Sequence, residues 1–255
     1  FLAGFIPGIL TGVLLMITAY VIAVKRGYKS EKFDGFLPLF YAFIGAIPGL
    51  MTAVIILGGV LSGIFTATES GAIAVIYSIL VSTFFYKTLS WESFKLATKN
   101  AVKTTAMVLF IIASASSFAW LLALNDVPSQ LFDIMQTISS NPLVILLLIN
   151  LILLLLGTFM DMSPLIIITT PIFLPVVVEL GMDPVQFGIM LMLNLGIGLV
   201  TPPVGSVLFV GCAVAKIPIE QTLKSIWPFY LALVAALMAV TYIPAVSMTL
   251  PKLFG

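Results

Sequence analysis

Two glycine- and proline-containing stretches interrupt long apolar segments of the sequence, and their oxygen atoms could bind a hard cation. The first is residues 157–164 (GTFMDMSP) and the second is residues 196–205 (GIGLVTPPVG). Where a helix breaks inside a membrane, its free backbone carbonyls and nearby hydroxyls can coordinate Na⁺. Glycine allows the backbone to turn its carbonyls toward a ligand, and proline ends the preceding half-helix. The two stretches therefore predict a cation site built from carbonyls and hydroxyls.

The candidate ligands are carbonyl groups and short oxygen-bearing side chains from both stretches. We expect the carbonyls to come from Gly157, Thr158, Met160, Gly196, Gly198 and Val200, and the side-chain oxygens from Asp161, Ser163 and Thr201. A single Gly or Pro motif more often only kinks a membrane helix. Two breaks in consecutive segments, one of which carries an acid, favour a functional site.

Asp161 is the acidic residue that the pattern places near the middle of the membrane, where ionisable groups are costly and usually functional. Two interpretations are open. Because Met162, Ser163 and Pro164 begin the next apolar arm, Asp161 could cap that helix at its N-terminus. Alternatively, the carboxylate could bind a coupling cation or carry a proton.

The composition excludes most other kinds of protein. Of the 255 residues, 61% are hydrophobic and 8% are charged, whereas soluble domains carry about 25% charged residues. This excludes a soluble enzyme, a disordered chain and a nucleic-acid binder, and it requires a lipid bilayer. With no histidine and one cysteine, Cys212, the sequence offers no imidazole base and no histidine-ligated metal. We therefore predict that the protein is not an enzyme.

Long runs of Leu, Ile, Val and Ala without alternation predict membrane-spanning helices rather than the strands of an outer-membrane barrel. We expect an all-α polytopic membrane protein. The apolar segments are 1–24, 36–61, 70–86, 104–124, 142–180, 184–217 and 226–250. The chain begins at Phe1 inside one of them, so we expect it to be part of a longer protein.

Segment 142–180 is too long for one crossing. Its arms, Leu143–Leu156 and Leu165–Val178, have 14 residues each, or roughly 21 Å, which is short for a membrane core of about 30 Å. If the segment enters the membrane and returns, all basic loops lie on the cytoplasmic side, as the positive-inside rule requires. Those loops hold Lys25, Arg26, Lys29, Lys32, Lys87, Lys95, Lys99, Lys103, Lys216 and Lys224. We therefore predict a re-entrant helical hairpin at 142–180, an interrupted helix at 184–217 and a final helix at 226–250.

Two segments have the amphipathic pattern of helices that lie in the membrane interface. Residues 90–103 combine apolar with basic positions, and residues 127–140 carry apolar residues at helical spacing. A plain connecting helix is the alternative for both. Three polar residues favour structural roles: Glu69 at the start of a helix, and Asn150 and Asn194 as hydrogen-bonding groups between helices.

The sequence resembles the large membrane subunit of tripartite ATP-independent periplasmic (TRAP) transporters, the DctM type. The resemblance rests on three runs: SGIFTATESGAIAVIYSIL (62–80), GTFMDMSPLIIITTPIFLPVV (157–177) and NLGIGLVTPPVGSVLFVGCAVAKI (194–217). It covers the whole chain and matches the C-terminal part of that subunit, from the end of its first repeat through its second. The hairpin and break of the first repeat, which would supply about half of the site, are not in this sequence.

The resemblance implies an inverted-repeat carrier of the elevator type. Residues 1–24 would be the last helix of the first repeat, 25–141 would be scaffold and arm helices, and 142–255 would be the transport domain. Carried over residue by residue, the Na⁺ ligands would be Gly157, Thr158, Met160, Gly196, Gly198, Thr201 and Pro202, mostly through carbonyls. Candidates for substrate binding or coupling would be Asp161, Ser163, Val200 and Pro203.

The implied partners are a small membrane subunit (DctQ-type) and a periplasmic substrate-binding protein (DctP-type). Na⁺ would be the coupling ion, and no other cofactor is implied. The leading hypothesis is Na⁺-coupled uptake of an organic acid, such as a C4-dicarboxylate or a sialic acid, across a bacterial inner membrane. The alternative is a stand-alone Na⁺- or H⁺-coupled anion symporter of the same superfamily, in which Asp161 would carry the proton.

Overall fold

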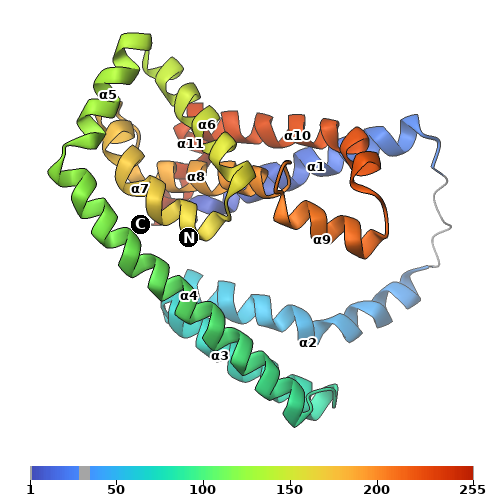
Figure 1. Ribbon diagram of the computed structural model, residues 1–255. Helices are drawn as coiled ribbons and strands as arrows, with labels where there is room; N and C mark the ends of the chain where they lie inside the picture. The colour runs from blue at the N-terminus through green and yellow to red at the C-terminus, as the bar shows by residue number, and fades with distance from the viewer. Residues whose placement is uncertain (1, 29–34, 255) are drawn as a thin grey trace. The chain divides into compact units, whose positions relative to one another are not determined.

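The structure describes residues 2–28 and 35–254, and helices joined by short turns and loops make up this part of the chain (Figure 1). The structure is a computed structural model. Its α-helices are α1 (Phe5–Lys25), α2 (Phe36–Leu61), α3 (Ala67–Leu80), α4 (Trp91–Leu124), α5 (Val127–Ile138), α6 (Pro142–Phe159), α7 (Met162–Glu179), α8 (Pro184–Leu199), α9 (Ser206–Ala215), α10 (Ile219–Tyr242) and α11 (Pro244–Phe254). A 3₁₀ turn (Leu2–Gly4) precedes α1, and a π-helical turn (Val81–Phe85) follows α3.

Seven of the described helices are long and apolar enough to cross a membrane. No β-strand occurs within residues 2–28 and 35–254. The prediction of an all-α polytopic membrane protein is therefore confirmed. The inverted repeat and the elevator motion stay predictions.

The chain divides into two compact units, residues 29–105 and residues 1–28 with 106–255. In the smaller unit α2 packs against α3, and the Tyr77 hydroxyl donates a 3.0 Å hydrogen bond to the Pro48 carbonyl. Helix α3 begins with a capping box in which Thr66 and Glu69 each accept from the other's backbone N–H. The helix-start role predicted for Glu69 is confirmed.

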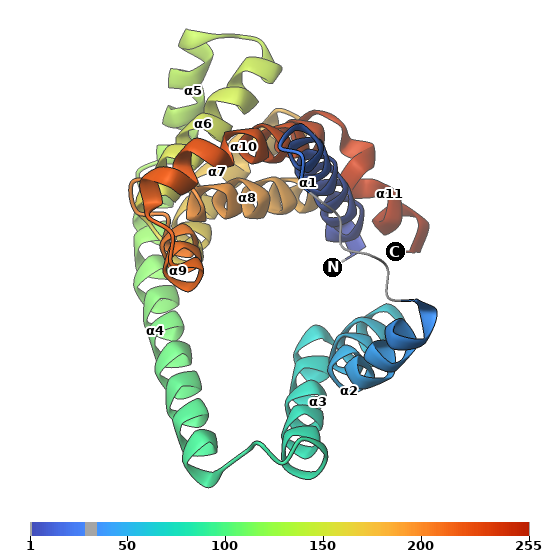
Figure 2. The same cartoon turned by 90° about the vertical axis from the view of Figure 1, so that its right-hand side faces the viewer.

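The larger unit is built around α8, which packs against α6, α7 and α10. Their apolar side chains form one buried core, with Leu153, Leu195 and Leu237 fully enclosed. Helix α1 lies against α10 and α11 (Figure 2). Helix α5 lies against α7 and places Met135 in this core. Interface positions for α5 and for residues 90–103 stay predictions.

A buried polar network joins α6, α8 and α10 inside this core. The Asn194 side-chain amide donates to the backbone carbonyl and to the Oδ1 of Asn150, at 3.0 and 2.8 Å. Asn150 donates in turn to the Thr241 hydroxyl at 3.2 Å. Gln186 on α8 donates to the backbone carbonyls of Val240 and Thr241 on α10. The prediction that Asn150 and Asn194 hydrogen-bond between helices is confirmed.

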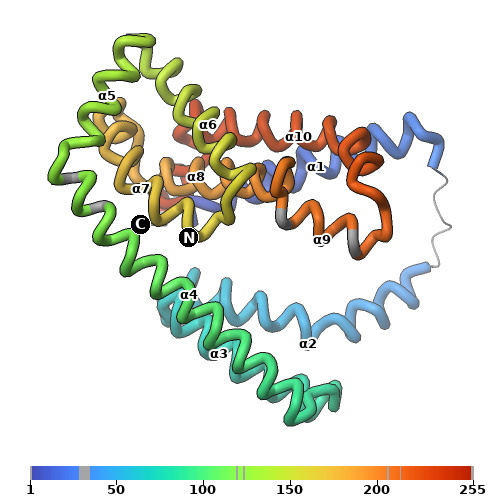
Figure 3. Tube along the Cα trace, in the orientation of Figure 1, coloured from blue at the N-terminus to red at the C-terminus, as the bar shows by residue number. Residues whose placement is uncertain are grey.

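Helices α6 and α8 run in the same direction, because Asn150 lies beside Asn194 and, further along both helices, Gly157 lies beside Gly198. Helix α7 is joined to α6 by Met160 and Asp161 and to α8 by residues 180–183, so it runs opposite to both (Figure 3). Segment 142–180 is thus a helical hairpin. Its re-entry from one side of a membrane stays a prediction.

The hairpin arms are longer than the sequence analysis predicted. Each has 18 residues rather than 14, because the helical backbone continues to Phe159 and resumes at Met162. At 1.5 Å per residue each arm is about 27 Å long, and both qualify by length and hydropathy as membrane spans. The argument that the arms are too short to cross was therefore wrong.

Two further boundaries were also wrong. Residues 90–103 and 104–124, expected as separate elements, form the single 34-residue helix α4. The expected final helix 226–250 is two helices, because α10 starts at Ile219 and ends at Tyr242, and α11 starts at Pro244. A proline disfavours the α conformation in the residue before it, and Ile243 is accordingly extended (φ −117°, ψ 90°).

The sidedness inferred from charge stays a prediction. Lys29 and Lys32, which contribute to it, lie outside the described residues. Lys224, expected in a loop, lies within α10. The assignment of 25–141 to a scaffold, and of 1–24 and 142–255 to a transport domain, also stays a prediction.

Candidate functional site

The two chain breaks identified in the sequence adjoin each other in the structure. The backbone N–H of Val204, in the second break, donates a 3.0 Å hydrogen bond to the Thr158 carbonyl in the last turn of α6. Next to this bond, Gly157 of α6 touches Gly198 of α8. Oxygen-bearing groups from the hairpin tip and from the interrupted helix therefore lie in one place.

The contact between Gly157 and Gly198 leaves no room for a side chain on α8. A Cβ atom at position 198 would lie 2.5 Å from the carbonyl carbon of Gly157 and 2.7 Å from its oxygen. Both glycines are helical, so their lack of a side chain permits close packing. The expectation that glycine is needed at these two positions to turn the backbone carbonyls inward was wrong, because both residues keep the helical conformation.

The first break is short. Helix α6 ends at Phe159, Met160 and Asp161 are extended, and α7 starts at Met162. Asp161 is the N-cap residue of α7, and its carboxylate accepts a 3.0 Å hydrogen bond from the N–H of Met162, the first residue of that helix. The predicted N-cap position of Asp161 is confirmed, while a role of its carboxylate in binding a cation or carrying a proton stays a prediction.

The second break, residues 200–205, is longer and is held by several hydrogen bonds. The Thr201 N–H donates to the Gly198 carbonyl at 2.9 Å, and its hydroxyl donates to the Ile197 carbonyl at 2.7 Å. The Val200 carbonyl accepts a 2.5 Å bond from the Tyr230 hydroxyl of α10. These bonds hold the start of the break against the last turn of α8 and restrain the Val200 carbonyl, which follows the helix.

The predicted site residues differ in how deeply they lie. Gly157 and Gly198 are buried; Thr158, Gly196, Val200, Thr201 and Pro202 are half-buried; Met160, Asp161, Ser163 and Pro203 are exposed. The buried and half-buried members gather around the contact between the breaks. Among the described residues, no hydrogen bond joins Asp161 or Ser163 to the second break.

The grouped atoms suit a small hard cation better than a proton or an electrophile. The carbonyls of Thr158 and Val200 each accept one hydrogen bond, and the second lone pair of a carbonyl can coordinate an ion. The Thr201 hydroxyl oxygen also keeps acceptor capacity after donating its hydrogen. Helix ends with free carbonyls carry partial negative charge, which attracts a cation.

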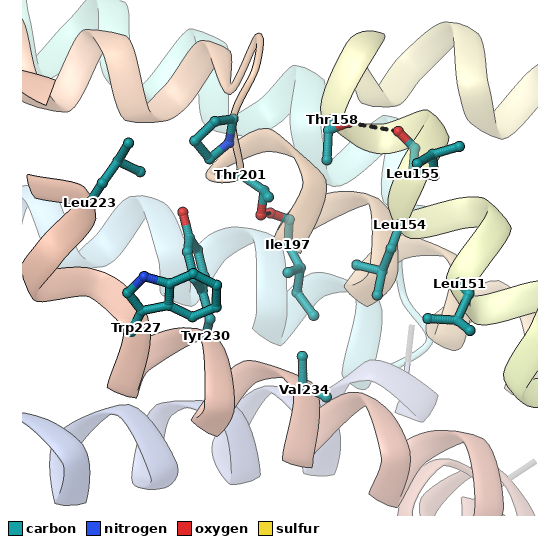
Figure 4. Close-up of a pocket in the computed structure, with 11 residues that line it drawn as sticks. Leu151, Leu154, Leu155, Thr158, Ile197, Thr201, Leu223, Trp227, Tyr230 and Val234 are labelled. Atoms are coloured by element: carbon teal, nitrogen blue, oxygen red, sulfur yellow. Dashed lines mark hydrogen bonds between the residues drawn. The ribbon is translucent and has the colours of Figure 1, made fainter. Parts of the chain in front are cut away.

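A cavity of about 500 Å³ lies beside the breaks, between α6, α8 and α10 (Figure 4). Its wall is mainly apolar and includes Leu154, Trp227 and Val234. Thr158 and Thr201 also line it. The Thr158 hydroxyl donates to the Leu155 carbonyl of the same helix, and the Thr201 hydroxyl donates to the Ile197 carbonyl in the last turn of α8. Among the described residues that line the cavity none is charged, so these residues offer no ion pair to an anion.

Two residues of the site were missed in the sequence. Val204 contributes through its backbone N–H and Tyr230 through its hydroxyl. A backbone donor carries no sequence signal. Tyr230 lies in an apolar segment that was interpreted only as a membrane span, and nothing in its neighbourhood pointed to residue 200.

Comparison with known proteins identifies the family. Residues 1–246 match the family described as "Tripartite ATP-independent periplasmic transporter, DctM component". The whole chain is 41% identical to part of the sialic acid TRAP transporter large permease protein SiaM of Vibrio cholerae and 38% identical to part of the C4-dicarboxylate TRAP transporter large permease protein DctM of Pseudomonas aeruginosa. Over 97% of its length it is 41% identical to part of the isethionate TRAP transporter permease protein DctMQ of Oleidesulfovibrio alaskensis.

The chain spans 60% of the length of the SiaM and DctM relatives and 39% of the DctMQ relative. Its placement in the C-terminal part of the subunit stays a prediction. The family consists of transport proteins, which confirms that the chain is not an enzyme. With seven described helices that can cross a membrane, the chain is a multi-pass membrane protein that belongs to the DctM family, the large permease component of TRAP transporters.

Proposed function

We propose that this chain forms the part of a Na⁺-coupled organic-acid permease in which Na⁺ binds where the two breaks meet. The observation that carries the proposal is the direct contact of the hairpin tip with the interrupted helix, through the Val204–Thr158 hydrogen bond and the Gly157–Gly198 packing. The proposed ligands are carbonyls of Gly157, Thr158, Gly198 and Val200 and the hydroxyl of Thr201. Helix breaks of this kind supply the cation sites of many secondary transporters.

A cation shared between the two breaks would couple them. It would draw carbonyl oxygens of α6 and of the second break together, and so stabilise the hairpin tip against α8. A ligand shifts a conformational equilibrium only by its difference in affinity for the two states. Na⁺ would therefore favour the state in which both breaks are in contact, and substrate binding to that state would be linked to it.

The proposed substrate is an organic anion. The relatives reported above are named for sialic acid, isethionate and C4-dicarboxylates, which are all organic acids. We propose that a periplasmic binding protein delivers the substrate, that a small membrane subunit accompanies this chain, and that the assembly lies in a bacterial inner membrane. Elevator motion of a transport domain, with the hairpin entering and leaving on one side, belongs to the same proposal.

Thr201→Val tests the cation site. The change removes one oxygen and keeps the shape, so the Na⁺ concentration for half-maximal uptake should rise about ten-fold, the size expected for losing an interaction with a charged group. Uptake is measured in liposomes that contain the complete transporter, with a Na⁺ gradient as the driving force.

Thr169→Val is the matched control. The Thr169 hydroxyl donates to the Leu165 carbonyl at 2.7 Å, the same bond within one helical turn that Thr201 makes, but it lies in α7 away from the breaks. Its Na⁺ dependence should stay as in the unmodified protein. Equal Na⁺ dependence in both variants would refute the site.

A further inference from the structure

The second break is joined to the rest of the protein from two sides. On one side Val204 is hydrogen-bonded to the hairpin tip. On the other side the Tyr230 hydroxyl of α10 donates to the carbonyl of Val200 at 2.5 Å. Val200 is the C-cap residue that directly follows α8, so the tyrosine hydroxyl is hydrogen-bonded to the first carbonyl of the break.

Packing orients Tyr230 for this bond. Its ring is half-buried and meets the Trp227 ring edge to face, with centroids 5.8 Å apart. The ring lies in the wall of the cavity beside the breaks, and its hydroxyl points toward the end of α8 (Figure 4). A tyrosine held by a neighbouring ring loses little further freedom when its hydroxyl forms a hydrogen bond.

The bond restricts the carbonyls that a cation would use. A carbonyl oxygen accepts along two lone-pair directions. When Tyr230 takes one direction at Val200, it restrains the peptide plane between Val200 and Thr201, to which the Thr201 side chain is attached. Since Thr201 is itself bonded to Gly198 and Ile197, the restraint reaches the residues that touch α6.

We propose that Tyr230 is a positioning residue that sets the cation affinity of the second break by holding the Val200 carbonyl. The inference rests on the proposed function, because it assigns Tyr230 an effect on the Na⁺ site proposed above. It adds α10 to the elements that determine cation binding, although no group of α10 is among the proposed ligands.

The test is Tyr230→Phe in the complete transporter reconstituted in liposomes. The variant loses only the hydroxyl, so the apolar packing with Trp227 remains. The Na⁺ concentration for half-maximal uptake should rise about five-fold, the value expected for losing one neutral hydrogen bond. The maximal rate of uptake at saturating Na⁺ should stay near that of the unmodified protein, because a bound Na⁺ holds the Val200 carbonyl in the same orientation.

Tyr242→Phe is the matched control. The Tyr242 hydroxyl, also on α10, donates a 2.9 Å hydrogen bond to the Leu143 carbonyl at the start of α6, and it lies outside the breaks. This variant should lose about as much thermal stability as Tyr230→Phe but keep the original Na⁺ dependence. A shift of equal size in both variants would mean a purely structural role and would overturn the inference.

The two proposals fail in different ways. If the unmodified transporter takes up substrate without any response to Na⁺, the proposed function is wrong and the inference falls with it. Suppose instead that the unmodified transporter needs Na⁺ and that Thr201→Val raises the Na⁺ concentration for half-maximal uptake. If Tyr230→Phe leaves this concentration unchanged, only the role of Tyr230 is wrong.

Discussion

Helices α6 and α8 contact each other in two different ways along their length. At Asn150 and Asn194 the contact is made by amide side chains inside a fully buried interface. At Gly157 and Gly198 no side chain intervenes, and backbone packs on backbone. The first contact uses its amide donors within the protein, while the second lies beside two chain breaks and leaves carbonyl lone pairs for a ligand. The asparagines therefore hold the two helices together through hydrogen bonds, and the glycines bring the two breaks into contact.

Gly198→Ala should break the second contact and have the largest effect. The new methyl group would lie 2.5 Å from the backbone of Gly157, and backbone atoms cannot move aside as a flexible side chain can. Overpacking of this kind costs about 1–3 kcal/mol or more. We expect uptake to be abolished and the thermal unfolding temperature in detergent to fall.

Gly188→Ala is the control for that experiment. It adds the same methyl group to the same helix at a position where nothing lies within 4 Å of the new atom. Alanine also favours a helix over glycine by about 1 kcal/mol, so stability should be unchanged or higher and uptake should persist. Full uptake by Gly198→Ala would show that α6 and α8 need not touch during transport.

Asn194→Leu tests the first contact, with a smaller expected effect. The change removes the donor to Asn150 and leaves the Asn150 acceptors without it, which costs about 1–3 kcal/mol in the free energy of unfolding. Because this contact lies away from the breaks, the Na⁺ concentration for half-maximal uptake should not change. Denaturation curves measure the free energy of unfolding, and uptake into liposomes measures the Na⁺ concentration for half-maximal uptake. A large shift in Na⁺ dependence without a loss of stability would contradict the division of roles between the two contacts.

The sequence predicted the existence of both breaks well, because Gly, Pro and polar residues inside an apolar run are a strong local signal. It did not predict where the helices end. Gly157 and Gly198 looked like helix breakers, yet both are helical, because tight packing between α6 and α8 favours glycine at this contact. Within the second break, Gly205 has a positive φ of +36°, and there the backbone conformation itself explains the glycine.

Prolines were a poor guide to helix boundaries for a related reason. Pro171, Pro175 and Pro228 lie inside helices, whereas Pro244 starts a new one. A membrane helix tolerates a proline when neighbouring groups satisfy the freed carbonyl, and this depends on tertiary contacts that local patterns do not show. The bond from Tyr230 to Val200 spans 30 residues and depends on the same tertiary arrangement.

Asp161 is expected to give the smallest effect. Its carboxylate caps α7 through the Met162 N–H and lies at the exposed edge of the first break. Asparagine caps a helix about as well as aspartate, while alanine loses about 1 kcal/mol. Asp161→Asn should therefore keep both stability and Na⁺-driven uptake, and Asp161→Ala should lower stability slightly. If Asp161 carried a proton instead, uptake driven by a pH gradient without Na⁺ would occur in the unmodified protein and would be lost in Asp161→Asn. That result would show that the Asp161 carboxylate couples transport to a proton, and that the carbonyls between the breaks are not the coupling site.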